Sequence, residues 1–171
     1  MNEKQRVAIH EAGHAVAACL MGKHYGCALH ANGGGIAGTG DLSEPAVIEN
    51  YTAEKLALVY AETDIQVLLA DAVVTAAGGV AEALARCEFH VHVSSGDRRL
   101  LTASCRRAFP VHGGLNDVDN AWANLAVTRA RALLFDQLCA VEAVAVALGE
   151  RGCLTAGEVA GLVAQRKEMS I

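Results

Sequence analysis

The sequence contains few prolines and few aromatic residues. Only two prolines occur among 171 residues, and aromatic side chains make up 4% of the chain. Alanine, leucine, valine, glutamate and arginine dominate instead, and this composition favours helices over strands. We therefore predict a mainly α fold, and a chain of this length is expected to form one compact domain over residues 1–171.

The sequence also lacks the hydrophobic signals of membrane or secreted proteins. No window holds the roughly 18 uninterrupted apolar residues of a membrane span. Met1 is followed by polar and charged residues, without the basic-then-apolar order of a secretory signal. These absences predict a cytoplasmic protein with no membrane partner.

Paired cysteines and an excess of basic charge are missing as well. The six cysteines are scattered without a CxxC pair, which argues against a cysteine-based zinc site and against a redox motif. The formal net charge is −5, which argues against nucleic acid as the main partner.

The first forty residues change from a helical to an extended pattern. Apolar residues at helical spacing predict a helix over residues 3–21, which Gly22 would end. Residues 24–30 suit a strand, residues 32–35 have turn composition, and residues 36–42 could return beside the first strand. A small β-hairpin or sheet edge is therefore expected after the first helix.

The rest of the chain is dominated by helical patterns. The segment from Cys87 to Val93 alternates loosely, as a strand can. Thr155 and Glu158 have capping-box spacing and predict the start of a short last helix. The other predicted helices cover 53–62, 64–86 after a cap at Thr63 or Asp64, 95–109 with Ser95 as the cap, and 116–148.

The first predicted helix carries the motif HExxH. His10 and His14 are four residues apart, so a helix places both imidazoles on one face, where they can bind one tetrahedral ion. Glu11 lies beside this pair and can accept a proton from a water on the metal. The motif predicts a zinc metallopeptidase, with Glu11 as the catalytic residue.

A catalytic zinc ion needs a third protein ligand, and spacing alone leaves four candidates. Asp97 lies at a predicted helix start, where a turn can direct its carboxylate inward. Glu82 lies in an apolar helix, so it needs a partner, either the metal or the outer N–H of a ligand histidine. His90 and His92 are the alternatives, since their spacing puts both on one face of a strand.

These motifs together resemble the peptidase domain of FtsH-type zinc metalloproteases, particularly stand-alone relatives without the ATPase. His10 to Val16 is similar to the family's HEAGHA signature, and Gly78 to Glu82 is similar to its GGRAAEE stretch at the end of a hydrophobic helix. The family's aspartate segment resembles residues 95–102, and its closing helices resemble residues 132–163. The motifs follow the same order over nearly the whole chain.

The resemblance implies one zinc ion held by His10, His14 and Asp97, and it moves Glu82 behind a ligand histidine. Val80 and Ala83 depart from the family, which usually has Arg and Glu there, and this puts subunit contacts or support of the site in doubt. Histidine and carboxylate ligands also accept cobalt, manganese or iron.

Two functions follow as hypotheses. The leading one is a zinc-dependent endopeptidase that cuts unfolded or flexible polypeptides, with the substrate as an added strand beside residues 36–42. The chain starts nine residues before His10, so we expect no room for an ATPase domain or membrane anchor, and hence ATP-independent cleavage. The alternative is a non-catalytic metal-binding or interaction module that serves a separate partner ATPase. The apolar helices also make a homo-oligomer plausible.

Overall fold

The computed structural model describes residues 1–30, 33–38, 64–110 and 116–168. It is mainly helical with one small antiparallel sheet, which confirms the predicted fold class. The predicted helix over 53–62 lies outside the described residues. The helices are α1 (Glu3–Leu20), α3 (Ile65–Ala85), α4 (Ser95–Ala108), α5 (Asn116–Leu134), α6 (Leu138–Arg151) and α7 (Ala156–Glu168), and the strands are β1 (Gly26–Leu29), β2 (Gly35–Gly38) and β3 (Cys153–Leu154).

Helix α1 forms where the HExxH pattern predicted it. Its start is a capping box, in which the Asn2 side chain accepts from the Gln5 backbone N–H and the Gln5 side chain accepts from the Asn2 backbone N–H, both at 2.9 Å. Its end lies at Leu20, and Gly22 follows with a φ of +74°, a left-handed conformation that glycine adopts without strain. Both helix ends are therefore set by local sequence.

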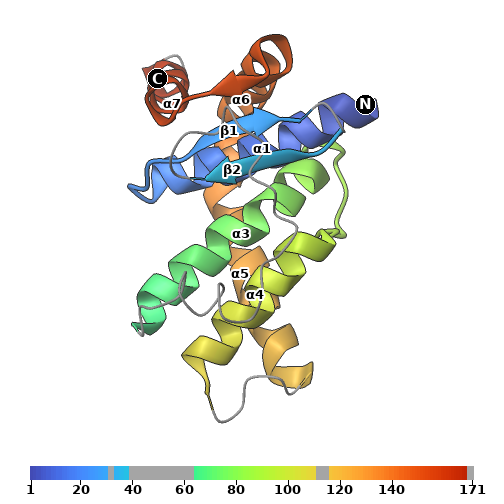
Figure 1. The fold of residues 1–171 in the computed structure, drawn as a ribbon, viewed down its shortest axis with the longest axis vertical. Coiled ribbons are helices and arrows are strands. Elements are labelled where there is room, and N and C mark those ends of the chain that lie inside the picture. Colours follow the sequence, from blue (N-terminus) through green and yellow to red (C-terminus); the bar gives the residue numbers. More distant parts are fainter. Residues whose placement is uncertain (31–32, 39–63, 111–115, 169–171) are drawn as a thin grey trace.

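The sheet has the strand order β2-β1-β3 and covers one face of α1 (Figure 1). Strands β1 and β2 form the predicted hairpin, with Cys27 opposite Ala37. Strand β3 comes from the segment between α6 and α7 and pairs with the other edge of β1, with Cys27 opposite Leu154. Sequence reasoning missed β3, because two residues are too few to show an alternating pattern.

Three predictions of local structure are wrong. The long helix over 116–148 is two helices, since α5 gives way to a 3-10 turn at Phe135–Gln137 and α6 continues to Arg151. This break allows α5 to pack on α3 while α6 packs on α1. Neither Pro nor Gly marks the break in the sequence, so local signals did not predict it. The cap of α4 is Ser94 rather than Ser95. Residues 87–93 form no strand.

Helices α1 and α3 form the centre of the core and pack closely. Most of their buried side chains are small, which lets the two backbones approach each other. Gly13 lies at this contact: a Cβ atom there would be 2.6 Å from Ala81 Cβ and 2.7 Å from the Ala77 carbonyl oxygen. Only a residue without a side chain fits between the helices at this point.

We expect Gly13→Ala to destabilise the protein by about 1–3 kcal/mol, because the added methyl group overpacks a contact that includes rigid backbone. The measurement is urea denaturation followed by circular dichroism. Gly161→Ala on α7 is the matched control, since nothing lies within 4 Å of its Cβ position. Equal stability of Gly13→Ala and the control would contradict the close packing.

Two helical stretches are long and apolar enough to cross a membrane by length and composition alone, Ile65–Ala85 and Asn116–Arg151. In α3, 72% of the most apolar window is buried inside the protein, so the core accounts for its composition. The second stretch is less buried, at 33%, and the 3-10 turn interrupts it.

Candidate metal centre

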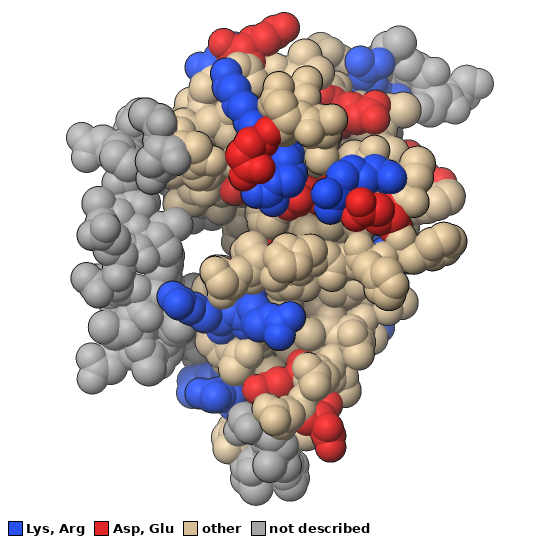
Figure 2. All heavy atoms as spheres, turned by 90° about the vertical axis from the view of Figure 1, so that its right-hand side faces the viewer, with Lys and Arg blue, Asp and Glu red and all other residues tan. Residues whose placement is uncertain are grey.

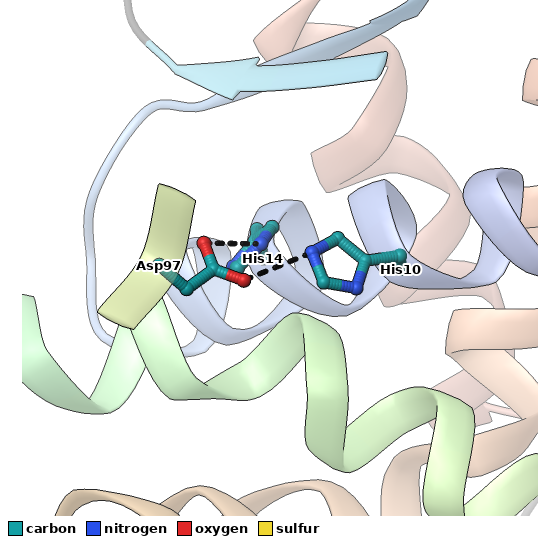
Figure 3. Close-up of side chains that lie close together, drawn as sticks. All are labelled: His10, His14 and Asp97. Atoms are coloured by element: carbon teal, nitrogen blue, oxygen red, sulfur yellow. Dashed lines mark ion pairs between the residues drawn. The ribbon is translucent and has the colours of Figure 1, made fainter. Parts of the chain in front are cut away.

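Two histidines from one helix and one aspartate from another lie close together (Figure 3). His10 and His14 lie one turn apart on α1, and Asp97 lies in the first turn of α4. All three side chains are largely buried, with exposed fractions of 12%, 10% and 11%. One ligand atom from each residue lies within 4.8 Å of the others, so this group could hold a metal ion.

The distances between the ligand atoms suit a small tetrahedral ion. His10 Nε2 lies 3.1 Å from Asp97 Oδ2, and His14 Nε2 lies 3.6 Å from Asp97 Oδ1. Bonds of about 2.0–2.1 Å at tetrahedral angles place neighbouring ligand atoms about 3.3 Å apart. The two observed distances lie on either side of this value.

Hydrogen bonds on the outer side hold both imidazole rings in the orientation that metal binding needs. His10 Nδ1 lies 2.7 Å from Glu82 Oε1, and His14 Nδ1 lies 2.8 Å from the Val74 carbonyl oxygen. An ionised carboxylate and a carbonyl can only accept, so each Nδ1 carries the proton and donates it. When the Nε2 proton is displaced, each imidazole can offer the Nε2 lone pair to an ion at the shared centre.

Asp97 is positioned by the cap of its own helix. Ser94 Oγ accepts from the Asp97 backbone N–H at 3.1 Å and donates to Asp97 Oδ2 at 2.8 Å. Burial raises the pKa of the Asp97 carboxyl, but the nearby His14 and the hydrogen bond from His10 outweigh burial and lower the pKa overall. Asp97 is thus an ionised oxygen donor at neutral pH.

The site favours a positive charge at His10. Burial lowers the pKa of His10, yet its hydrogen bonds with Asp97 and Glu82 raise the pKa overall to about 10. The same two carboxylates favour any cation that takes the place of the proton. The negative charge of Asp97 and Glu82 and the positions of the ligand atoms therefore both suit a bound cation.

Glu11 lies beside the metal ligands and under the sheet. A Cβ atom on Gly35 of β2 would be 2.5 Å from Glu11 Cγ and 2.9 Å from Glu11 Oε1, so the strand crosses directly over this side chain. Burial raises the pKa of the Glu11 carboxyl, and the two histidines only partly offset this effect. A raised pKa brings a carboxylate closer to the range in which it exchanges protons efficiently near neutral pH.

Gly78 of α3 provides the space in which the two imidazoles meet. A Cβ atom at this position would lie 2.4 Å from His14 Nε2 and 2.7 Å from His10 Nε2. A side chain would therefore occupy the volume next to the metal-binding nitrogens. The resemblance placed Gly78 in the GGRAAEE-like stretch, but sequence reasoning did not predict that this glycine would lie against His10 and His14.

Of the four candidates for the third ligand, only Asp97 lies in one group with the two histidines. Asp97 joins the two histidines, and Glu82 lies behind His10, where it bonds the outer nitrogen. His90 and His92 are exposed and, in the described part of the chain, belong to no group of metal-binding side chains. Their segment forms no strand, so the face that spacing predicted for them does not exist. Sequence reasoning missed Ser94, Gly35 and the Val74 carbonyl.

Comparison with protein-family models and with curated proteins finds no match to this chain. The assignment of the site therefore depends on its own geometry.

Proposed function

We propose that this protein is a zinc-dependent metalloendopeptidase that hydrolyses peptide bonds in unfolded or flexible polypeptides without ATP. The observation that carries the proposal is the convergence of His10, His14 and Asp97, with Glu11 beside them and both outer histidine nitrogens hydrogen-bonded. The resemblance of several motifs, in order along the chain, to those of FtsH-type peptidase domains supports the same activity. Zinc is favoured because two imidazoles and one carboxylate leave a fourth tetrahedral position open.

The chemistry divides between the ion and the side chains. When bound, zinc supplies a Lewis acid that polarises a carbonyl group and makes a water more acidic. Glu11 would accept a proton from the attacking water while the water oxygen bonds to the peptide carbon. Glu11 would then donate the proton to the amide nitrogen while the C–N bond breaks, which yields one carboxylic acid and one amine that ionise to a carboxylate and an ammonium group.

The proposed substrate is an extended peptide lying along β2. Among the described strands β2 pairs only with β1, so it is an edge of the sheet. Gly35 puts the start of this strand directly over Glu11. Backbone hydrogen bonds to an edge strand require an extended chain, which a folded protein seldom presents. This requirement supports unfolded or flexible substrates.

The test is metal-dependent cleavage by the wild-type protein. Protein depleted of metal by a chelator is expected to leave a fluorescent casein-like unfolded substrate intact, and one equivalent of zinc per chain is expected to restore cleavage. Product analysis by mass spectrometry should show internal cuts, and omission of ATP should not change the rate. A tightly folded substrate is expected to stay uncut.

The other outcomes are distinct. Protein that binds one zinc ion and cuts no polypeptide would favour the alternative, a metal-binding module that serves a partner ATPase. Protein that takes up no metal, and whose melting temperature is unchanged by zinc or chelator, would contradict both readings.

A further inference from the structure

Arg6 connects two carboxylates next to the metal centre. Its Nη1 donates to Glu82 Oε2 at 3.1 Å and to Oε1 at 3.4 Å, while its Nη2 and Nε donate to the two oxygens of Glu3 at 2.5 and 3.0 Å. The guanidinium thus uses separate nitrogens for the two partners. A planar group with several fixed donors can bridge in this way, whereas an ammonium group presents no such fork.

The contact with Glu82 is the buried half of this bridge. The Glu82 side chain is 8% exposed, whereas that of Glu3 is 70% exposed. Burial raises the pKa of the Glu82 carboxyl, but hydrogen bonds from His10 and Arg6 outweigh burial and lower the pKa. A buried carboxylate that loses one partner is left poorly compensated, so the Arg6 contact has more weight than an ordinary surface pair.

The orientation of Glu82 bears directly on His10. Glu82 Oε1 accepts from His10 Nδ1, and Arg6 holds the same carboxylate from the other side. A carboxylate free to rotate or to move toward solvent would hold the imidazole less firmly, and His10 Nε2 would then point less accurately to the metal.

We propose that Arg6 is a positioning residue of the metal centre, which fixes Glu82 in the orientation that presents His10 to the ion. The inference rests on the proposed function, since it concerns how the same site is held. Arg6 acts through Glu82: in the described part of the chain its side chain hydrogen-bonds to Glu82 and Glu3, and not to His10, His14 or Asp97.

Simple electrostatics and positioning through Glu82 predict opposite effects on metal affinity when Arg6 is replaced by an uncharged residue. Removing a positive charge near a cation site should strengthen metal binding. Positioning through Glu82 predicts that the same substitution weakens it. The start of α1 lies on the face shown in Figure 2, where acidic and basic side chains are intermingled. Another exposed ion pair, Arg86 with Glu88, provides a matched control.

The experiment measures zinc affinity by competition with a chromophoric chelator, and the visible absorption spectrum of the cobalt-substituted protein. Arg6→Met keeps an apolar stem without the charge, and it is expected to lower zinc affinity on the order of 10-fold and to shift the cobalt bands. Arg86→Met is the control, because Arg86 has a similar exposed fraction, 38% against 36%, and pairs with Glu88 at 2.9 Å. We expect its affinity and spectrum to match the wild type.

A double-mutant cycle tests whether Arg6 acts through Glu82. In a Glu82→Gln background, Arg6→Met is expected to change affinity by less than about twofold, because the group it positions is already altered. Glu3→Gln leaves Arg6 in place and removes only its outer anchor. Glu3→Gln should also lower zinc affinity, by a smaller factor than Arg6→Met. This variant keeps the inference testable if Arg6→Met does not fold.

The inference is overturned if Arg6→Met leaves affinity and spectrum unchanged or tightens binding, or if its effect is fully additive with Glu82→Gln. It is also overturned if Arg86→Met weakens binding equally. Failure of the proposed function has a different signature: the wild-type protein would take up no metal, or would bind metal and cut nothing.

Discussion

Glu11→Gln is expected to lower the turnover rate for an unfolded polypeptide by roughly 10²–10⁴-fold, the usual contribution of a positioned general base. Glutamine has nearly the same shape, so it fits under Gly35 without new contacts, but its amide cannot accept the proton of the water. Glu11 does not belong to the group of three residues that could hold a metal ion, so the zinc content should stay at one per chain. Steady-state kinetics and metal analysis on the same preparation check both expectations.

The matched control for this variant is Glu142→Gln. Glu142 is an exposed carboxylate on α6, far along the chain from the site, and it forms no part of the metal group. Its turnover rate should equal that of the wild type. If Glu11→Gln kept more than about a tenth of the wild-type rate with zinc bound, another group would have to move the proton, and the assigned role of Glu11 would be wrong.

Gly78→Ala is expected to abolish stoichiometric zinc binding, and with it all metal-dependent activity. The methyl group would lie 2.4 Å from His14 Nε2 and 2.7 Å from His10 Nε2, so both rings must move. Neither ring can move freely, since Val74 and Glu82 hold their outer nitrogens at 2.8 and 2.7 Å. The variant must lose either these hydrogen bonds or the alignment of the metal-binding nitrogens.

Thermal unfolding with and without zinc separates this effect from general destabilisation. At zinc concentrations 100-fold above its dissociation constant, the wild type should gain about 2.7 kcal/mol, while Gly78→Ala should gain nothing. Gly157→Ala on α7, with nothing within 4 Å of its Cβ position, should respond to zinc as the wild type does. A normal zinc response from Gly78→Ala would show that the two imidazoles do not meet where the structure places them.

The helices and the first two strands follow from local patterns in the sequence. The end of α1 before Gly22 and the box of Thr155 with Glu158 depend on residues close in the chain, and both were predicted. The cap of α3 was predicted at Thr63 or Asp64, and Asp64 is the cap. The break between α5 and α6 was not predicted, because it serves the packing of two helices on different partners. A structural feature that depends on contacts between residues far apart in the sequence cannot be predicted from the residues next to it alone.

His10, Glu11 and His14 can be recognised as a unit from their spacing, because a helix brings residues four apart to one face whatever surrounds it. The rest of the candidate metal group depends on how the helices pack. Asp97 becomes the third member because α4 starts beside α1 and α3, while Glu82 is turned to the outer nitrogen of His10. Distances between helices depend on packing, and at Gly13 and Gly78 that packing leaves room for no side chain at all.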